Sequence, residues 1–117
     1  MLENIHKERE KLLLQLRKRT VRNFMDILIL SELRKTPMSG YDVITSIFDR
    51  FSFLPSSGSV YSLLYSLERA GLIEGGWNGR KRIYSLTSEG QEFSESALAL
   101  YERIEGVIMN IFADGIR

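Results

Sequence analysis

The sequence of 117 residues contains no cysteine and only one histidine, His6. The missing cysteines exclude disulfide frameworks, thiolate zinc sites and cysteine nucleophiles. His6 has no constellation of carboxylates or other ligands around it in the sequence, which argues against a metal site or a catalytic role. The sequence also has no phosphate-binding loop motif and no pair of acids beside a base. We therefore expect neither an enzyme nor a bound cofactor.

Long apolar runs are absent as well, since no run reaches the roughly 20 residues that a bilayer-spanning helix needs. The first residues are charged and amphipathic, unlike the apolar region of a signal peptide. We therefore expect a cytoplasmic protein without a membrane partner. A chain of this length that is 44% hydrophobic can bury one modest core, so a second full domain is not expected.

Charge is distributed unevenly along the chain, although the formal net charge is only +1. Residues 1–36 carry nine Lys or Arg against five Asp or Glu, whereas residues 83–117 carry two against six. A basic front and an acidic tail are typical of a protein with one surface facing polyanions and another facing protein. Solvated surface helices give the same pattern without any partner.

Residues 3–19 favour a helix with a thin apolar stripe among basic side chains, formed by Ile5, Leu12, Leu13 and Leu16. Such a helix cannot bury its stripe alone, so we expect it to pack on a partner element. Its positive charge is then either solvated or close to nucleic-acid phosphates, and packing is the interpretation that we favour.

Two further helices follow. From Val21 to Lys35 apolar residues nearly encircle the helix, which is typical of a central, buried element. Ser39 can cap the next helix, with Asp42 in an acidic version of the capping box, and Gly40 permits a close turn. We expect the buried face of that helix to consist of Ile44, Ile47, Phe48 and Phe51.

The stretch from Ser56 to Thr87 has the pattern of a recognition helix followed by a wing. Either Ser56 or Ser57 caps the helix, and Ala70-Gly71 ends it. Its buried face has the helical spacing of Val60, Leu63, Leu64 and Leu67. Its outer face is hydroxyl-rich and consists of Ser59, Ser62, Tyr65, Ser66 and Arg69.

The wing is predicted from Asn78-Gly79, the strongest two-residue hairpin signal. A loop at these two residues pairs Trp77 with Arg80 and Ile73 with Tyr84. In this register Arg80 and Arg82 lie on the side of Tyr84 and Lys81 lies on the reverse. The tip of the wing therefore presents cations in both directions.

Thr87 or Ser88 caps a last helix, and Ser88 with Gln91 fits a capping box. Apolar residues then recur at alternating steps of four and three, the spacing of a coiled-coil seam: Phe93, Ala97, Leu100, Ile104, Val107 and Ile111. A second stripe beside the seam consists of Leu98, Tyr101, Ile108 and Phe112. An exposed surface of this width marks an interface, so we infer a homodimer built on this helix.

Three segments together resemble the PadR family of winged helix-turn-helix transcriptional regulators: PMSGYDVITSIF, SSGSVYSLLYSLERAGLIEGG and RKRIYSLTSEG. The resemblance implies a mainly α fold with a small β-hairpin. It also implies a winged helix-turn-helix DNA-binding domain over residues 1–86, in which residues 1–20 are an extra basic helix outside the family pattern. A C-terminal dimerisation helix over residues 87–117 completes the chain.

The resemblance is to the short branch of the family, and it implies a homodimer that binds a palindromic promoter element as a repressor. Some relatives sense aromatic compounds in a cavity between the C-terminal helices, and Tyr101 lies where such members present an aromatic side chain. Tyr101 is therefore our choice for a ligand pocket that would take a small aromatic effector; the alternative, which we favour, is that it packs in the core or the interface. The expected dimerisation residues are Phe93, Ala97, Leu100, Tyr101, Ile104, Val107, Ile108 and Ile111.

Affinity for double-stranded DNA is expected to rest on phosphate neutralisation by Arg80, Lys81 and Arg82. The starts of two helices offer amides and hydroxyls to phosphate oxygens, from Ser39, Gly40, Tyr41, Ser57, Gly58, Ser59 and Tyr61. The candidates to reach base edges in the major groove are Ser59, Ser62 and Tyr65. Tyr61 fits a half-buried core position equally well, and Trp77 is expected to cover the base of the hairpin rather than touch the DNA backbone.

The outer face of the recognition helix carries a single cation, Arg69. This favours readout of DNA by hydroxyls, methyl groups or shape over paired contacts between arginine and guanine. The shortage of cations also supports a rival interpretation, in which the winged helix binds another protein instead of DNA. The basic wing argues for DNA.

Overall fold

The structure is a computed structural model that describes residues 1–116, without the side chains of Phe112 and of residues 114–116. The elements in chain order are α1 (Leu2–Asn23), α2 (Met25–Lys35), β1 (Met38–Ser39), α3 (Gly40–Phe51), α4 (Ser57–Arg69), β2 (Ile73–Asn78), β3 (Lys81–Leu86) and α5 (Ser88–Ile116). The predicted fold class is confirmed, because the chain is mainly helical with a small antiparallel sheet in a winged-helix arrangement.

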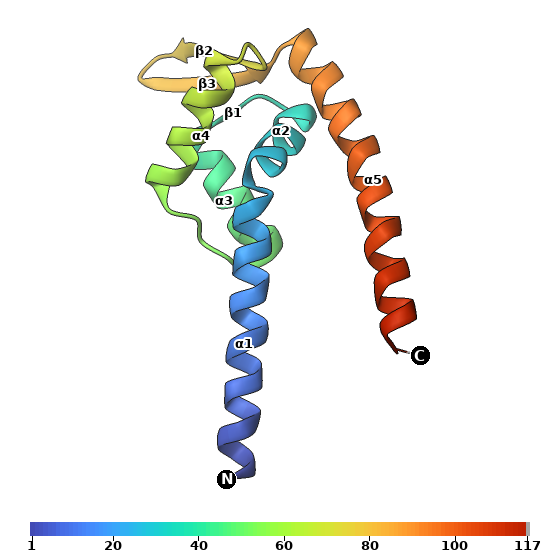
Figure 1. The fold of residues 1–117 in the computed structure, drawn as a ribbon. Helices are drawn as coiled ribbons and strands as arrows, with labels where there is room; N and C mark the ends of the chain where they lie inside the picture. The colour runs from blue at the N-terminus through green and yellow to red at the C-terminus, as the bar shows by residue number, and fades with distance from the viewer. Residues whose placement is uncertain (117) are drawn as a thin grey trace.

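The helices α2, α3 and α4 and the sheet form a head from which α1 and α5 project (Figure 1). Both projecting helices extend away from the β2–β3 hairpin, so the two ends of the chain lie on the same side of the molecule. In α1 the one buried residue is Val21. The stripe that we expected to pack on a partner element, Ile5, Leu12, Leu13 and Leu16, is exposed, so no part of residues 1–116 covers it.

The core of the head is formed where α2 meets α3, α4 and the sheet. Ile29 and Leu30 of α2 are fully buried, as the nearly continuous apolar surface of this helix predicts. The predicted buried face of α4 is confirmed, with Leu63 at its edge. For α3 one assignment is wrong: Phe48 is 46% exposed, and Val43 is fully buried instead. The buried face is centred on Val43 and Ile47, and Phe48 is rotated out of it by one helical step of about 100°.

A buried ion network joins α2 to α3. The side chain of Glu32 is only 2% exposed, although charged residues are seldom buried without partners. Its carboxylate accepts hydrogen bonds from Ser46 and Arg50 of α3 and from Lys35 of its own helix. Two helices of the head are therefore tied by charge as well as by apolar packing.

The sheet has the order β1-β3-β2 and is antiparallel throughout. In the hairpin Asn78 pairs with Lys81, Trp77 with Arg82 and Ile73 with Leu86. The predicted pairing of Trp77 with Arg80 and of Ile73 with Tyr84 is wrong by two residues, because the loop is Gly79-Arg80. The shift of two places Arg80 in the turn and leaves Arg82 and Tyr84 on one face of β3.

The turn geometry explains the error. Gly79 has a φ of 64°, and Arg80 is not among the positive-φ residues of the described chain. A type II′ turn needs positive φ only at its first central residue, which is usually glycine, whereas Asn-Gly in a type I′ turn needs it at both. The glycine therefore occupies the first position of the loop and not the second.

Most helix caps are the ones predicted from the sequence. Ser39 and Asp42 form the predicted capping box of α3, and Ser56, one of the two alternatives, caps α4. At α5 the cap is Thr87, whose hydroxyl accepts from the Gly90 amide at 3.0 Å and donates to the Gly71 carbonyl at 2.7 Å. The predicted capping box of Ser88 and Gln91 is wrong, since the Gln91 side chain donates to Glu95 instead.

Among the helices of residues 1–116, none has the length and apolar composition of a membrane-spanning segment.

Candidate nucleic-acid interface

A groove of about 400 Å³ lies where the start of α3, the outer face of α4 and the wing meet. We use wing for β2, the Gly79-Arg80 turn and β3. The groove brings together eight of the predicted DNA contacts from segments far apart in sequence: Ser39, Gly40, Tyr41, Tyr61, Tyr65, Arg80, Lys81 and Arg82. Trp77 and Tyr84 complete its lining. The groove therefore combines cations with aromatic and hydroxyl side chains.

The other predicted contacts lie outside this groove. Ser57 and Ser59 line a neighbouring cavity of about 780 Å³ beside the start of α4. That cavity also contains Arg22, whose guanidinium carbon lies 5.6 Å from the centre of the Phe53 ring. Gly58 and Ser62 are exposed on the surface of α4. The candidate contacts thus form one broad surface around α4 rather than a single pocket.

The outer face of α4 is exposed, as predicted, but not all its hydroxyls are free. The Ser56 hydroxyl donates to that of Ser59 at 2.7 Å and accepts from the Ser59 amide at 3.1 Å. The Ser66 hydroxyl donates to the Ser62 carbonyl one turn earlier. Over residues 1–116 no hydrogen bond engages the side chains of Ser62 and Tyr65, which remain available to a ligand.

Tyr61 connects α4 to the start of α3. Its ring lies so close to Gly40 that a Cβ added there would stand 2.5 Å from the ring atom Cε1. A larger residue at position 40 would push the ring away from this position. Gly40 is therefore required for the approach of the two helices, and the Tyr61 ring packs against it while remaining 37% exposed.

The three cations of the wing occupy different environments. Arg80 and Lys81 are exposed at the tip, and no ion pair within the described part of the chain engages them. Arg82 instead pairs with Glu68 of α4, at 2.6 Å between Nη2 and Oε2. Its guanidinium carbon lies 5.8 Å from the Trp77 ring centre and 5.6 Å from that of Tyr84. Trp77 belongs to β2, and its exposed ring lines the groove.

The comparisons with known proteins agree with this geometry. The model of the transcriptional regulator PadR-like family matches residues 29–96, more than half of the chain. The protein belongs to the PadR-like family of transcriptional regulators. None of the proteins with curated descriptions matches the chain.

Solved structures support the PadR-like assignment. A PadR family transcription regulator from Clostridium difficile R20291 is 30% identical, with a TM-score of 0.70 over 76% of this chain and 97% of that one. One from Eggerthella lenta DSM 2243 is 24% identical and has a TM-score of 0.75 over 94% and 96% of the two chains. A transcriptional regulator from Clostridium thermocellum is 23% identical, with a TM-score of 0.72 over 78% and 92%. The last two show the likeness of fold alone.

The C-terminal helix of this PadR-like chain leaves most of its predicted dimerisation residues exposed, including Phe93, Leu100, Ile104, Val107, Ile108 and Ile111. Ala97 is buried, and together with Ser94 it marks the face of α5 that turns towards the head. The side chain of Phe112, from the second stripe, and residue 117, the end of the predicted dimerisation segment, lie outside the described residues.

Tyr101, the predicted pocket residue, packs edge-on against Phe24, with ring centres 5.0 Å apart. Burial raises the pKa of its hydroxyl, and the Asp26 carboxylate acts in the same direction. The cavity between α2 and α5 lies elsewhere, between Leu30 and Leu98, and measures about 60 Å³. A cavity that binds benzene measures about 150 Å³, so this one is too small for an aromatic effector.

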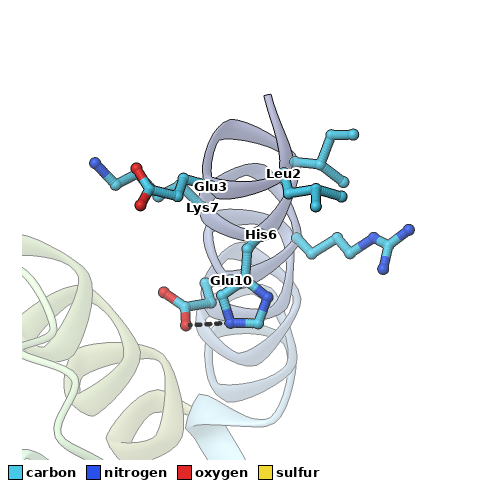
Figure 2. Close-up of a pocket in the computed structure, with 7 residues that line it drawn as sticks. Leu2, Glu3, His6, Lys7 and Glu10 are labelled. Atoms are coloured by element: carbon cyan, nitrogen blue, oxygen red, sulfur yellow. Dashed lines mark ion pairs between the residues drawn. The ribbon is translucent and has the colours of Figure 1, made fainter.

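A concave region on α1 carries no site. Figure 2 shows side chains of Leu2, Glu3, His6, Lys7 and Glu10 projecting from a single helix. His6 Nε2 lies 3.4 Å from a carboxylate oxygen of Glu10, one turn further along the same helix. Both side chains are largely exposed, and such pairs contribute little to stability.

Glu68 and Arg22 are the residues of this surface that pattern reasoning missed. Glu68 lies at the end of the recognition helix, and its partner Arg82 is in the wing. Opposite charges on the two elements were visible in the sequence, but the angle between helix and hairpin was not. Arg22 fell in the stretch from Val21 to Lys35 that was predicted as one central helix, whereas it lies in the last turn of α1.

Proposed function

We propose that this PadR-like regulator is a homodimer that binds a palindromic promoter element in double-stranded DNA and represses transcription from it. The observation that carries the proposal is the convergence of the α3 start, the α4 outer face and the exposed wing cations on one groove. In this division residues 1–86 are the DNA-binding domain and residues 87–117 the dimerisation helix.

The contacts divide by chemistry. Arg80 and Lys81 neutralise phosphates and supply the salt-dependent part of the affinity. The starts of α3 and α4 direct amides and hydroxyls at phosphate oxygens and so set the register of the protein on DNA. Ser62 and Tyr65 are exposed along the middle of α4 and reach base edges in the major groove. Arg82, paired with Glu68, adds less to phosphate binding than its charge suggests.

Dimerisation is supported by the uncovered apolar side chains of α5. The side chain of Leu100, in the middle of the seam, is 55% exposed. The stripe of α1 is uncovered too, and its basic surroundings complement the acidic C-terminal segment. A dimer that covers both helices holds two recognition helices about 34 Å apart, one turn of DNA.

The proposed effector site of the dimer includes Tyr101. The ring lies where α5 meets the junction of α1 and α2, at Phe24, whose backbone angles of φ −107° and ψ 16° depart from those of an α-helix. A small aromatic compound bound between the helices of a dimer acts on this junction, and through α2 on the head.

The test is a polarisation titration of a labelled duplex carrying the DNA upstream of the protein's own gene, at about 50 mM and about 200 mM salt. We expect one dimer per duplex and much weaker binding at the higher salt concentration. A reporter behind the same DNA should fall in expression when the protein is supplied. Absence of binding at low salt would exclude the repressor and favour the rival interpretation, a module that binds protein.

A further inference from the structure

One carboxylate joins the recognition helix to both strands of the wing. Glu68, near the end of α4, accepts hydrogen bonds from Arg82 Nη2 at 2.8 and 2.6 Å. It also accepts a bond of 3.0 Å from the Gly75 amide of β2. Charge-assisted bonds of this length are among the stronger ones in proteins. This one side chain therefore supplies polar contacts from α4 to both strands of the wing, in addition to the apolar packing of Leu67 against the sheet.

Arg82 is held on its other sides by rings. Its guanidinium lies over Trp77 and Tyr84, and its side chain is 34% exposed, unlike those of its exposed neighbours Arg80 and Lys81. Its Nε is buried and finds no acceptor within residues 1–116. The guanidinium is thus held between Glu68 and the two rings.

Gly75 leaves the space that this arrangement needs. A Cβ at this position would collide with Arg82 Nε and would stand 2.9 Å from Glu68 Oε2. Both atoms are at the ends of flexible side chains, so an alanine is accommodated only if these side chains separate. Position 76, by contrast, has open space around it.

We propose that Glu68, Arg82 and Gly75 form a clamp that fixes the wing against the recognition helix, and that Arg82 is a positioning residue for DNA binding. This rests on the proposed function, in which α4 enters the major groove while Arg80 and Lys81 contact phosphates. Contacts on two elements add to specificity only when the distance between the elements is fixed closely. The third strand, β1, is only two residues long and pairs with β3 at Ile83 and Tyr84, so the sheet alone gives the outer part of the hairpin little support.

The variant that separates positioning from charge is Gly75→Ala, which opens the clamp without changing any charge. Gly76→Ala is the matched control. Dissociation constants are measured on the tightest duplex that the wild-type protein selects from a random pool and on a scrambled duplex. We expect Gly75→Ala to reduce the ratio of specific to non-specific affinity about tenfold, with an unchanged salt slope. Gly76→Ala should behave as the wild type.

Neutralising Glu68 gives a second test, because the direction of the change in DNA affinity distinguishes an electrostatic effect from loss of the clamp. Glu68→Gln removes a negative charge beside DNA, so electrostatics alone predicts tighter binding, whereas loss of the clamp predicts weaker specific binding. Glu74→Gln, on the exposed surface of β2, is the control for charge. We expect the Glu68→Gln, Arg82→Gln double variant to lose no more specificity than either single variant, because each one opens the same clamp.

Three outcomes overturn the proposal. The first is unchanged specificity in both Gly75→Ala and Glu68→Gln, and the second is additive losses of specificity in the double variant. The third is a salt slope that becomes flatter by about 2 in Arg82→Gln, which is the change expected if Arg82 contacts a phosphate in each protomer. Exchange of the Gly75 amide in the protein without DNA reports the clamp alone, and Glu68→Ala should accelerate it about tenfold. If the exchange rate of this amide is the same in Glu68→Ala as in the wild type, the clamp does not form. Failure of the wild type to select any duplex instead counts against the proposed function.

Discussion

The hydroxyl of Ser46 on α3 donates a hydrogen bond of 2.6 Å to the buried carboxylate of Glu32 on α2. Burial alone would raise the pKa of Glu32. The bonds from Ser46 and Arg50 and the charge of Lys35 outweigh it, so the pKa lies below its ordinary value of 4.5. The head therefore keeps a charged group in its interior because the folded chain surrounds it with donors.

Acid should weaken the head through Glu32. As the pH falls, Glu32 takes up a proton in the unfolded chain before it does so in the folded protein. The contribution of its carboxylate to the free energy of unfolding is therefore complete above about pH 4.5 and is lost as the pH falls through the lower pKa of the folded state. Glu32→Gln should cost about 2 kcal/mol near pH 7 and should lose less stability than the wild type on acidification. Urea unfolding near pH 7 and near pH 3, at one protein concentration, measures both effects. Asp49→Asn, on the exposed face of α3, is the control, and equal acid sensitivity of wild type and Glu32→Gln would contradict the assignment.

The stability of the protein should be sensitive to an alanine substitution at Gly79 in the wing turn and insensitive to one at Gly76. Gly79 has a φ of 64°, which an alanine adopts only with strain, so Gly79→Ala should lower the free energy of unfolding by about 1 kcal/mol. Gly76→Ala lies in the same hairpin, at a position with neither positive φ nor close neighbours, and should have little effect. Thermal unfolding distinguishes the two variants. Equal melting temperatures would argue against the II′ turn.

The parts of the fold that local chemistry decides were predictable. The 3.6-residue period places Val60, Leu64 and Leu67 on the buried face of α4 whatever the rest of the chain does. The capping box of Ser39 and Asp42 is equally local. The fold class followed from the order of these elements.

The errors arose where several elements compete for the same residues. Phe48 has the spacing of a core residue, but Val43 and Ile47 already fill the space that α3 presents to α2 and α4. Two good turn registers were available at residues 78–80, and the glycine conformation decided between them. Strand β1 contains only two residues, too few for any periodicity.

The candidate site was predictable as a set of residues but not as an arrangement. Arg80, Lys81 and Arg82 look equivalent in sequence, but Arg80 lies in the turn, and Lys81, predicted on the reverse side, lines the same groove as Arg82 and Tyr84. Only the packing of the wing on α4 separates Arg82, held by Glu68, from two exposed cations. Pairing between distant elements depends on an angle that no local pattern contains.

The exposed cations of the wing should account for the salt dependence of DNA binding. Two protomers that contribute Arg80 and Lys81 neutralise about four phosphates, which gives a slope of about −4 for the logarithm of affinity against the logarithm of salt. Replacing both with glutamine should remove most of this slope and leave the dimer intact. Lys7→Gln with Lys11→Gln removes the same charge from α1 and should leave the slope unchanged. Equal slopes in the two double variants would refute the role of the wing.

The dimer should depend on the seam of α5 and not on the helix as a whole. Leu100 lies in the seam, whereas its exposed neighbour Ala99 lies outside both apolar stripes. Leu100→Glu places a charge where a second helix packs, so light scattering at micromolar concentration should give the mass of one chain. Ala99→Glu adds the same charge and should remain dimeric. Since a monomer presents a single recognition helix, Leu100→Glu should also bind a palindromic duplex about a hundredfold more weakly. A dimeric Leu100→Glu variant would show that the two heads are held together by another surface.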